Sequence, residues 1–201
     1  PTTPLPPSKM PAPSVRPLSQ LTPFEQLVHS YSTGPPTLDK NEEARTIHHY
    51  LVPHPSSANS MLTIRQAWDF FPDECNLRFE SATQDPPARV SYLLKVIPKQ
   101  CNYLQNLHGG CAATLIDILS STLLLALSKP GLFSYGGVSR NLKTTYIRPV
   151  PAGTEIRVVC ELVHMGKRMA LLRAEIQKLD GSVCVVAEHD KANTDPADIK
   201  I

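Results

Sequence analysis

The stretch NYLQNLHGGCAATLIDILSSTLLLALS, residues 102–128, decides the fold of this chain. After the pair Gly109-Gly110 it is almost wholly apolar, and it carries one acid, Asp117, among aliphatic residues. This pattern predicts a long helix over residues 109–128, ended by the Lys-Pro-Gly sequence that follows, with apolar side chains on nearly all of its faces. A helix of this kind must be covered on several sides to be stable in water.

Short extended segments surround this helix. Two precede it, at 76–80 and 89–97, and four follow it, at 137–147, 155–164, 168–179 and 182–192. The sequences Met165-Gly166-Lys167 and Asp180-Gly181 separate the last three segments and indicate hairpins, the Asp-Gly pair favouring a tight primed turn. We therefore expect an α+β fold in which a strongly curved antiparallel sheet wraps one central helix, with a four-stranded meander after the helix.

Composition disfavours several classes of protein. A length of 201 residues suffices for one domain with a full core, and a formal net charge of +2 with scattered basic residues gives no sign of nucleic-acid binding. The five cysteines form no Cys-x-x-Cys pair, which disfavours a disulfide framework or a structural zinc site and fits a reduced intracellular protein. The apolar run 115–127 is interrupted by polar residues and is shorter than the ~20 residues that span a bilayer, so no membrane span is expected.

The N-terminal third differs in composition from the rest. Residues 1–36 hold ten of the 20 prolines and are expected to form a tail or a wrapping arm. Within this arm, Thr22, Pro23 and Glu25 indicate a helix start, so a short helix is expected over 21–31. The remaining divisions are a helical extension over 37–74, with helices at 39–51 and 62–70, the main domain 75–195 and a tail 196–201. The lack of an apolar signal segment favours the cytoplasm, with mitochondria as the alternative.

Gly109, Gly110 and Asp117 together indicate chemistry at an acyl group. The first N–H groups of a helix lack intrahelical partners and attract negative charge, and a lone carboxylate is costly to bury without a use. Oxyanion donors and a carboxylate suit hydrolysis. However, Gly109 and Asp117 lie eight positions apart, roughly 12 Å along one helix, which is too far for one reacting carbon. Two antiparallel copies of the helix would bring them together, so the spacing favours a site shared across a two-fold dimer.

The residues that flank the glycines offer alternative chemistry. His108 could act as a base, although a role in fixing the loop before the helix or in lining the substrate channel is preferred. Cys111 could act as a nucleophile, but no separate base for it is evident. The expected chemistry needs no metal and no cofactor apart from any coenzyme A that belongs to the substrate.

Two quoted runs carry a resemblance to a known family. The run NLHGGCAATLIDILSS, followed by GGVSRNLKTTYIRPVPAGTEI and a Gly-Lys hairpin, resembles the hotdog-fold acyl-CoA thioesterases. Within the 4-hydroxybenzoyl-CoA thioesterase superfamily it is similar to the phenylacetate-pathway type and its small animal relatives, over about residues 89–192. The resemblance implies a hotdog fold, a homodimer or a dimer of dimers, and hydrolysis of acyl-CoA or acyl-carrier-protein thioesters.

The resemblance also implies roles for individual residues. Asp117 matches the family's general base or nucleophile, and Gly109 matches the residue whose N–H binds the thioester carbonyl. Asn102 and Ser139 match the residues that orient the water or the carboxylate. The predicted substrate-binding set has two parts. Basic residues would bind the phosphates of coenzyme A or a carrier protein, and they are Arg148, Lys167, Arg168 and Lys143. Gly110, the second glycine at the helix start, is the other part.

One different class of function stays open at this stage. A hotdog domain could bind acyl groups, or assemble with partners, without turnover. The presence of all the matched catalytic residues disfavours this alternative. A hotdog hydratase or dehydratase would need a catalytic histidine in a different motif, which is not found.

Overall fold

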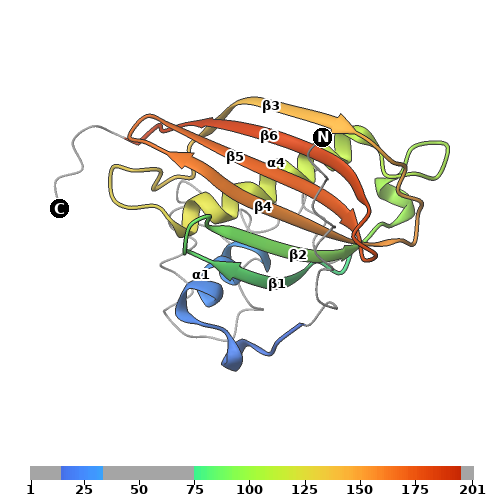
Figure 1. The fold of residues 1–201 in the computed structure, drawn as a ribbon, viewed down its shortest axis with the longest axis horizontal. Helices are drawn as coiled ribbons and strands as arrows, with labels where there is room; N and C mark the ends of the chain where they lie inside the picture. The colour runs from blue at the N-terminus through green and yellow to red at the C-terminus, as the bar shows by residue number, and fades with distance from the viewer. Residues whose placement is uncertain (1–14, 34–74, 196–201) are drawn as a thin grey trace, which may run out of the picture.

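The computed structural model describes residues 15–33 and 75–195 (Figure 1). The helices predicted at 39–51 and 62–70 and the tail 196–201 lie outside the described residues, and the predicted domain boundaries stay predictions. The helices are η1 (Leu18–Gln20), α1 (Pro23–Thr33), η2 (Pro98–Gln100) and α4 (Gly109–Ala126). The strands are β1 (Arg78–Thr83), β2 (Arg89–Lys95), β3 (Val138–Tyr146), β4 (Glu155–Met165), β5 (Met169–Lys178) and β6 (Val183–Ala192).

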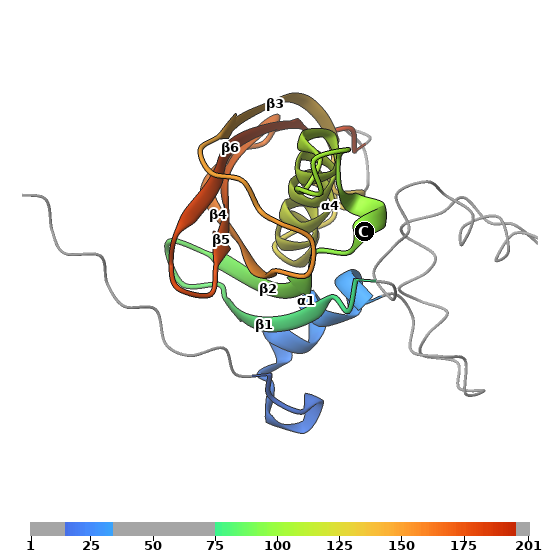
Figure 2. The same ribbon diagram turned by 90° about the vertical axis from the view of Figure 1, so that its right-hand side faces the viewer.

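The strands form one antiparallel sheet in the order β1-β2-β4-β5-β6-β3. Figure 2 shows this sheet curving around α4, which lies along its concave face. Strand β4 alternates as its sequence predicts, because Ile156, Val158 and Cys160 are all fully buried on the side of the helix. The predicted α+β fold, with a curved sheet around one central helix, is confirmed.

The predicted four-stranded meander is wrong in one respect. Strands β4, β5 and β6 form a meander, but β3 pairs with β6 at the edge of the sheet and does not touch β4. The linker between β3 and β4 crosses the loop before α4, where Leu107 donates to the carbonyl of Val150 (2.8 Å) and Ala152 donates to the carbonyl of Gln105 (2.8 Å). These bonds fix the linker where it passes the start of α4, and the chain then enters β4, which pairs with β2. The sheet therefore has strands on both sides of the helix.

The turn between β5 and β6 is tight but is not of the predicted primed type. Gly181 has φ +87° and donates to the carbonyl of Lys178 (2.9 Å), whereas Asp180 keeps a negative φ. A primed turn of the Asp-Gly type needs positive φ at both residues. Gly181 is instead a single left-handed residue that follows an ordinary turn. It adds one residue to the loop, and the strand register shifts between Ile176 and Gln177.

Helix α4 combines a membrane-like composition with a core position. Its length and mean hydropathy of 1.6 would allow it to cross a membrane, and half of it is buried within the protein. A helix at the centre of a wrapped sheet meets the same criterion, and Ile116, Leu119, Leu123 and Leu124 here pack into the core. The apolar faces of α4 are therefore accounted for by the sheet that covers them.

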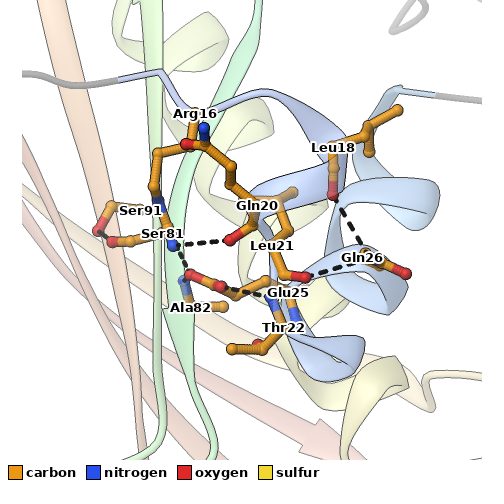
Figure 3. Close-up of polar contacts among 10 residues, drawn as sticks. All are labelled: Arg16, Leu18, Gln20, Leu21, Thr22, Glu25, Gln26, Ser81, Ala82 and Ser91. Carbon is orange, nitrogen blue, oxygen red and sulfur yellow. Dashed lines mark hydrogen bonds and ion pairs between the residues drawn. The ribbon is translucent and has the colours of Figure 1, made fainter.

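Helix α1 is fixed against the edge strand β1 through Glu25 (Figure 3). Thr22 donates its N–H to Glu25 Oε2 (2.9 Å), and Glu25 returns an N–H to Thr22 Oγ1 (3.2 Å), which is a reciprocal capping box. The predicted start at Thr22 and Pro23 is thus confirmed. Glu25 Oε1 also accepts the N–H of Ala82 on β1 (3.4 Å) and pairs with Arg16. Unpaired strand edges invite association, so this contact also covers part of one edge.

The buried carboxylate of Glu25 should contribute to stability in a pH-dependent way. Burial alone would raise its pKa, but the hydrogen bonds from Arg16, Thr22 and Ala82 outweigh burial and lower the pKa below its ordinary value. The stabilisation is therefore present above the ordinary pKa and is lost as the pH falls through the lower folded-state pKa.

We predict that Glu25→Ala lowers the free energy of unfolding at pH 7 by about 1–3 kcal/mol, since it removes a cap and a buried charged hydrogen-bond acceptor. Glu25→Gln, which keeps the capping geometry, should lose less. Urea unfolding from pH 7 down to pH 3 should show the difference between wild type and Glu25→Gln shrinking on acidification. A difference that grows on acidification would contradict this assignment.

Candidate active site

Asp117 lies in the middle of α4 with its two carboxylate oxygens in different surroundings. Oδ1 accepts a hydrogen bond from Ser139 Oγ (2.7 Å) on β3 and lies 3.1 Å from Nε2 of His189 on β6. Oδ2 has no hydrogen-bond partner in the part of the chain that the structure describes, and 45% of the side chain is exposed. One oxygen therefore holds the carboxylate in place, and the other is open to a ligand.

His189 is the functional residue that the sequence analysis missed. Its ring is fully buried, with Nε2 2.9 Å from Ser139 Oγ and Nδ1 2.7 Å from Ser120 Oγ on α4. Because Ser139 donates to Asp117, its oxygen is free to accept, so Nε2 must carry a proton that faces both Ser139 and Asp117. His189 thus ties β3, β6 and α4 together around one carboxylate.

Lys191, two positions along β6, points to the same region. It is 5% exposed, and its Nζ donates to Ser121 Oγ (2.7 Å), which in turn donates to the main-chain carbonyl of Asp117 (2.6 Å). Burial lowers the pKa of Lys191, while the charge of Asp117 acts to raise it. A buried ammonium beside a carboxylate is favourable only if the carboxylate is ionised.

The surroundings of Asp117 keep it ionised. The hydrogen bond from His189 is the largest influence on its pKa, which is lowered to about 2. Partial burial acts in the opposite direction, and the Ser139 hydrogen bond and the charges of His189 and Lys191 lower the pKa further. Asp117 is therefore an anion at any pH at which the protein would work.

At the N-terminus of α4, the two glycines have different roles. His108 is the N-cap, and its Nδ1 accepts the N–H of Gly110 (3.0 Å). The N–H of Gly109 has no acceptor among residues 15–33 and 75–195. Of the two glycine donors, the one on Gly109 is thus open to a ligand at the positive end of the helix dipole. His108 Nδ1 thus caps the start of the helix, while the role of His108 in a reaction stays a prediction.

Asn102 shapes the loop before the helix. Its Oδ1 accepts the N–H groups of Leu104 (3.0 Å) and Asn106 (3.2 Å). It also lines, with Gly109, Tyr146 and Arg148 among others, an open cavity of about 480 Å³. Because the side-chain oxygen Oδ1 of Asn102 accepts these two loop N–H groups, its side-chain NH₂ group is the part able to face a ligand.

The predicted residues fall into two groups within one chain. Asn102, His108, Gly109 and Gly110 gather at the start of α4, whereas Asp117 and Ser139 meet at its middle. Eight residues of helix, roughly 12 Å, separate the groups.

The predicted basic residues do not form one cluster. Arg148 borders the cavity at Gly109 and donates to the carbonyl of Val183 (2.5 Å). Lys143 lines a separate cleft of about 350 Å³ with Arg173 and Glu188. Lys167 and Arg168 lie in the turn between β4 and β5, at the opposite end of β3 from Arg148. A single chain therefore brings only Arg148 to the Gly109 end.

Cys111 is a poor nucleophile in this setting. Burial, with the nearby thiols of Cys75 and Cys101, raises its pKa to about 11, so the reactive thiolate is scarce at neutral pH.

Within residues 15–33 and 75–195, no group of three or more His, Cys, Asp or Glu side chains is arranged to hold a metal ion.

Comparison with known proteins agrees with this geometry. The family model described as "Thioesterase superfamily" matches residues 104–185, which include Gly109, Asp117 and Ser139 but not Asn102 or His189. The matched segment is thus similar to proteins of the thioesterase superfamily. The chain is similar to acyl-coenzyme A thioesterase 13 of Mus musculus and of Homo sapiens, with 29% identity over 106 residues in each case, covering 52% of this chain and 73% of theirs.

Solved structures show the same fold. Thioesterase superfamily member 2 from Mus musculus superposes with a TM-score of 0.53 at 25% identity, covering 69% of this chain and 98% of that one. A phenylacetic acid degradation protein from Thermus thermophilus superposes with a TM-score of 0.52 at 17% identity, covering 61% and 97%. The predicted hotdog fold and the predicted family are confirmed.

We predict that His189→Phe raises the pKa of Asp117 from about 2 towards its ordinary value of about 4, because the largest stabiliser of the anion is removed. His189→Gln, which can place an N–H near the position of Nε2, should raise it less. The measurement is a pH titration of the Asp117 carboxyl carbon by ¹³C NMR. An unchanged Asp117 pKa in His189→Phe would show that the histidine does not hold the anion.

Proposed function

We propose that this protein hydrolyses acyl thioesters, with acyl-CoA as the substrate class, to give a free acid and a thiol. The match of residues 104–185 to the thioesterase superfamily and the similarity to acyl-CoA thioesterase 13 support this activity. The observation that carries the proposal is the state of Asp117, an ionised carboxylate with one oxygen anchored by Ser139 and the other open. Such an arrangement suits attack on a carbonyl carbon.

The start of α4 would bind the carbonyl oxygen of the substrate. The unpartnered Gly109 N–H lies where the helix dipole favours negative charge, which develops on that oxygen as the carbon becomes tetrahedral. Arg148 borders the same cavity and suits a phosphate of coenzyme A, or an acidic group on a carrier protein. The exposed apolar side chains of Leu104 and Tyr146 would line the path of the thioester.

Asp117 would supply the attacking oxygen or activate it. As a general base it takes a proton from a water held near Ser139, and the water oxygen bonds to the acyl carbon. As a nucleophile its free oxygen bonds to that carbon first, and water then releases the acid. In both cases the carbon–sulfur bond breaks and the thiolate takes up a proton. All of these steps use protein groups and water alone.

The site would be shared between two copies of the chain. Gly109 and Asp117 of one copy lie roughly 12 Å apart, and the face of α4 between them is only half-buried. Strand β3 beside it is an edge strand with most side chains exposed, including Val138 and Tyr146. An antiparallel second copy would cover this edge and bring its Asp117 to the Gly109 of the first. Its Lys167 and Arg168 would then approach the Arg148 end.

A domain that binds acyl groups without turnover is the alternative, and it would not need an anchored anion. Burial of His189 and Lys191 around Asp117 is costly and serves no purpose in simple apolar binding. The two possibilities differ in whether thiol is released from a panel of acyl-CoA substrates.

We predict that Asp117→Asn lowers kcat for thiol release from acyl-CoA at least ~100-fold, because the neutral amide can neither accept a proton nor attack. The matched control is Asp190→Asn, the neighbour of His189 whose side chain lies on the other face of β6, and it should keep wild-type turnover. Release is followed with a thiol reagent across short, long and aromatic acyl chains. Equal rates for Asp117→Asn and wild type would refute the proposed chemistry.

A second prediction tests the shared site. Asp117→Ala and Gly109→Pro should each be inactive, but equal amounts refolded together should recover about a quarter of the wild-type activity, because half of the dimers are mixed and each has one intact site. Proline suits the first helical position and removes the N–H, and its Cβ also crowds Tyr146, which adds to the loss of activity in that chain. Circular dichroism of each variant alone verifies folding. Folded variants that recover no activity on mixing would place both groups in one chain.

A further inference from the structure

Tyr146, the last residue of β3, makes the closest side-chain approach to Gly109. Its hydroxyl donates to the carbonyl of Gly109 (2.8 Å) and accepts a hydrogen bond from Thr144 Oγ1 (3.0 Å). In the structure Tyr146 is bonded directly to the residue whose N–H is open to a ligand.

The bond to Tyr146 completes a set that fixes both peptide groups next to the Gly109 Cα. On one side, the His108 carbonyl accepts the N–H of Ala112 (2.9 Å). On the other side, the peptide between Gly109 and Gly110 is held at both ends, by Tyr146 at its carbonyl and by His108 Nδ1 at its N–H. The Gly109 N–H lies in the plane of the 108–109 peptide, and the anchored 109–110 peptide restricts rotation about the Gly109 Cα that joins the two planes, so loss of the Tyr146 anchor would loosen the donor.

Tyr146 also explains why residue 109 is glycine. Gly109 does not have a positive φ, so its backbone would suit any L-residue. A Cβ there would lie 3.0 Å from Tyr146 Cζ and 3.1 Å from its hydroxyl oxygen. Because two hydrogen bonds hold the ring, it cannot move aside freely. The ring, and not the turn of the chain, is what crowds a β-carbon at position 109.

We propose that Tyr146 is a positioning residue for the carbonyl-binding donor: it holds the Gly109 carbonyl, occupies the space beside Gly109, and so aims the Gly109 N–H at the substrate. The proposal rests on the proposed thioester hydrolysis. A misaligned donor weakens binding of the developing oxyanion more than binding of the ground state, so the effect falls mainly on kcat.

Tyr146→Phe tests the hydroxyl without removing the ring. We expect kcat to fall about tenfold with KM within about twofold, since one anchor of the donor is lost and the donor itself remains. Hydrogen exchange of the Gly110 amide, followed by NMR, should become several-fold faster. Thr144→Val, which leaves the bond from Tyr146 to Gly109, should change kcat less than Tyr146→Phe does, and Tyr135→Phe at an exposed tyrosine elsewhere should match wild type.

The outcomes separate this proposal from the function on which it rests. If wild type releases no thiol, the proposed function fails, and the Gly110 exchange rate alone decides the role of Tyr146. If wild type is active, an unchanged kcat with unchanged Gly110 exchange in Tyr146→Phe overturns the proposal. A fall in kcat in which Tyr135→Phe shares equally would also overturn it.

A double-mutant cycle tests the steric part independently of activity. Gly109→Ala should lower the Tm by about 3 °C or more in wild type, and by much less when Tyr146 is already alanine, because the clash is then absent. Equal losses of Tm in both backgrounds would overturn the claim that the ring dictates glycine at 109.

Discussion

Two polar contacts hold Oδ1 of Asp117, one from Ser139 and one from His189, and the arrangement of the candidate site depends on them. An apolar helix inside a wrapped sheet is stable through burial alone, but a carboxylate in its middle is not. Polar partners must therefore come from the strands that face it. They do so on β3 and β6, which are neighbours at one edge of the sheet.

The two ends of the proposed chemistry are stabilised by different means. At the carboxylate, three side chains from the two strands β3 and β6 act on one charge and lower its pKa. At the start of α4, main-chain groups carry the function, and side chains serve to orient them. His108 and Tyr146 bind the two ends of one peptide group there. A backbone donor cannot be removed by most substitutions, so its orientation is the property that neighbouring residues control.

Local signals made the fold predictable. The periodicity of 109–128, the glycine turns and the alternation in β4 depend on near neighbours in sequence, and each is found in the structure. The capping box formed by Thr22 and Glu25 likewise depends on residues within a span of four positions. In the candidate site, the glycines and Asp117 stand out because they break an apolar helix pattern, so they could be selected without coordinates.

What the sequence did not reveal depends on pairing between distant segments. His189 and Lys191 reach α4 across some 70 residues, and only the strand register shows that they point inwards. A hint was available, because Val185, Ala187, His189 and Lys191 share one face of β6 and two of the four are polar. The edge position of β3 was missed for a related reason. Strands that follow one another usually pair, and the sequence of the proline-containing linker between β3 and β4 does not indicate that they are separated in the sheet.

The unequal edges of the sheet limit how far copies of this protein can join. Glu25 and α1 occupy the β1 side, whereas β3 leaves its outer backbone groups open within the described part of the chain. A sheet with two open edges can add strands without end and grow into a filament. A sheet with one blocked edge stops after a single addition, because the joined pair presents only its two protected outer sides. Within the described residues, α1 thus covers part of the β1 edge and would hinder the addition of a strand there, whereas the β3 edge would allow it.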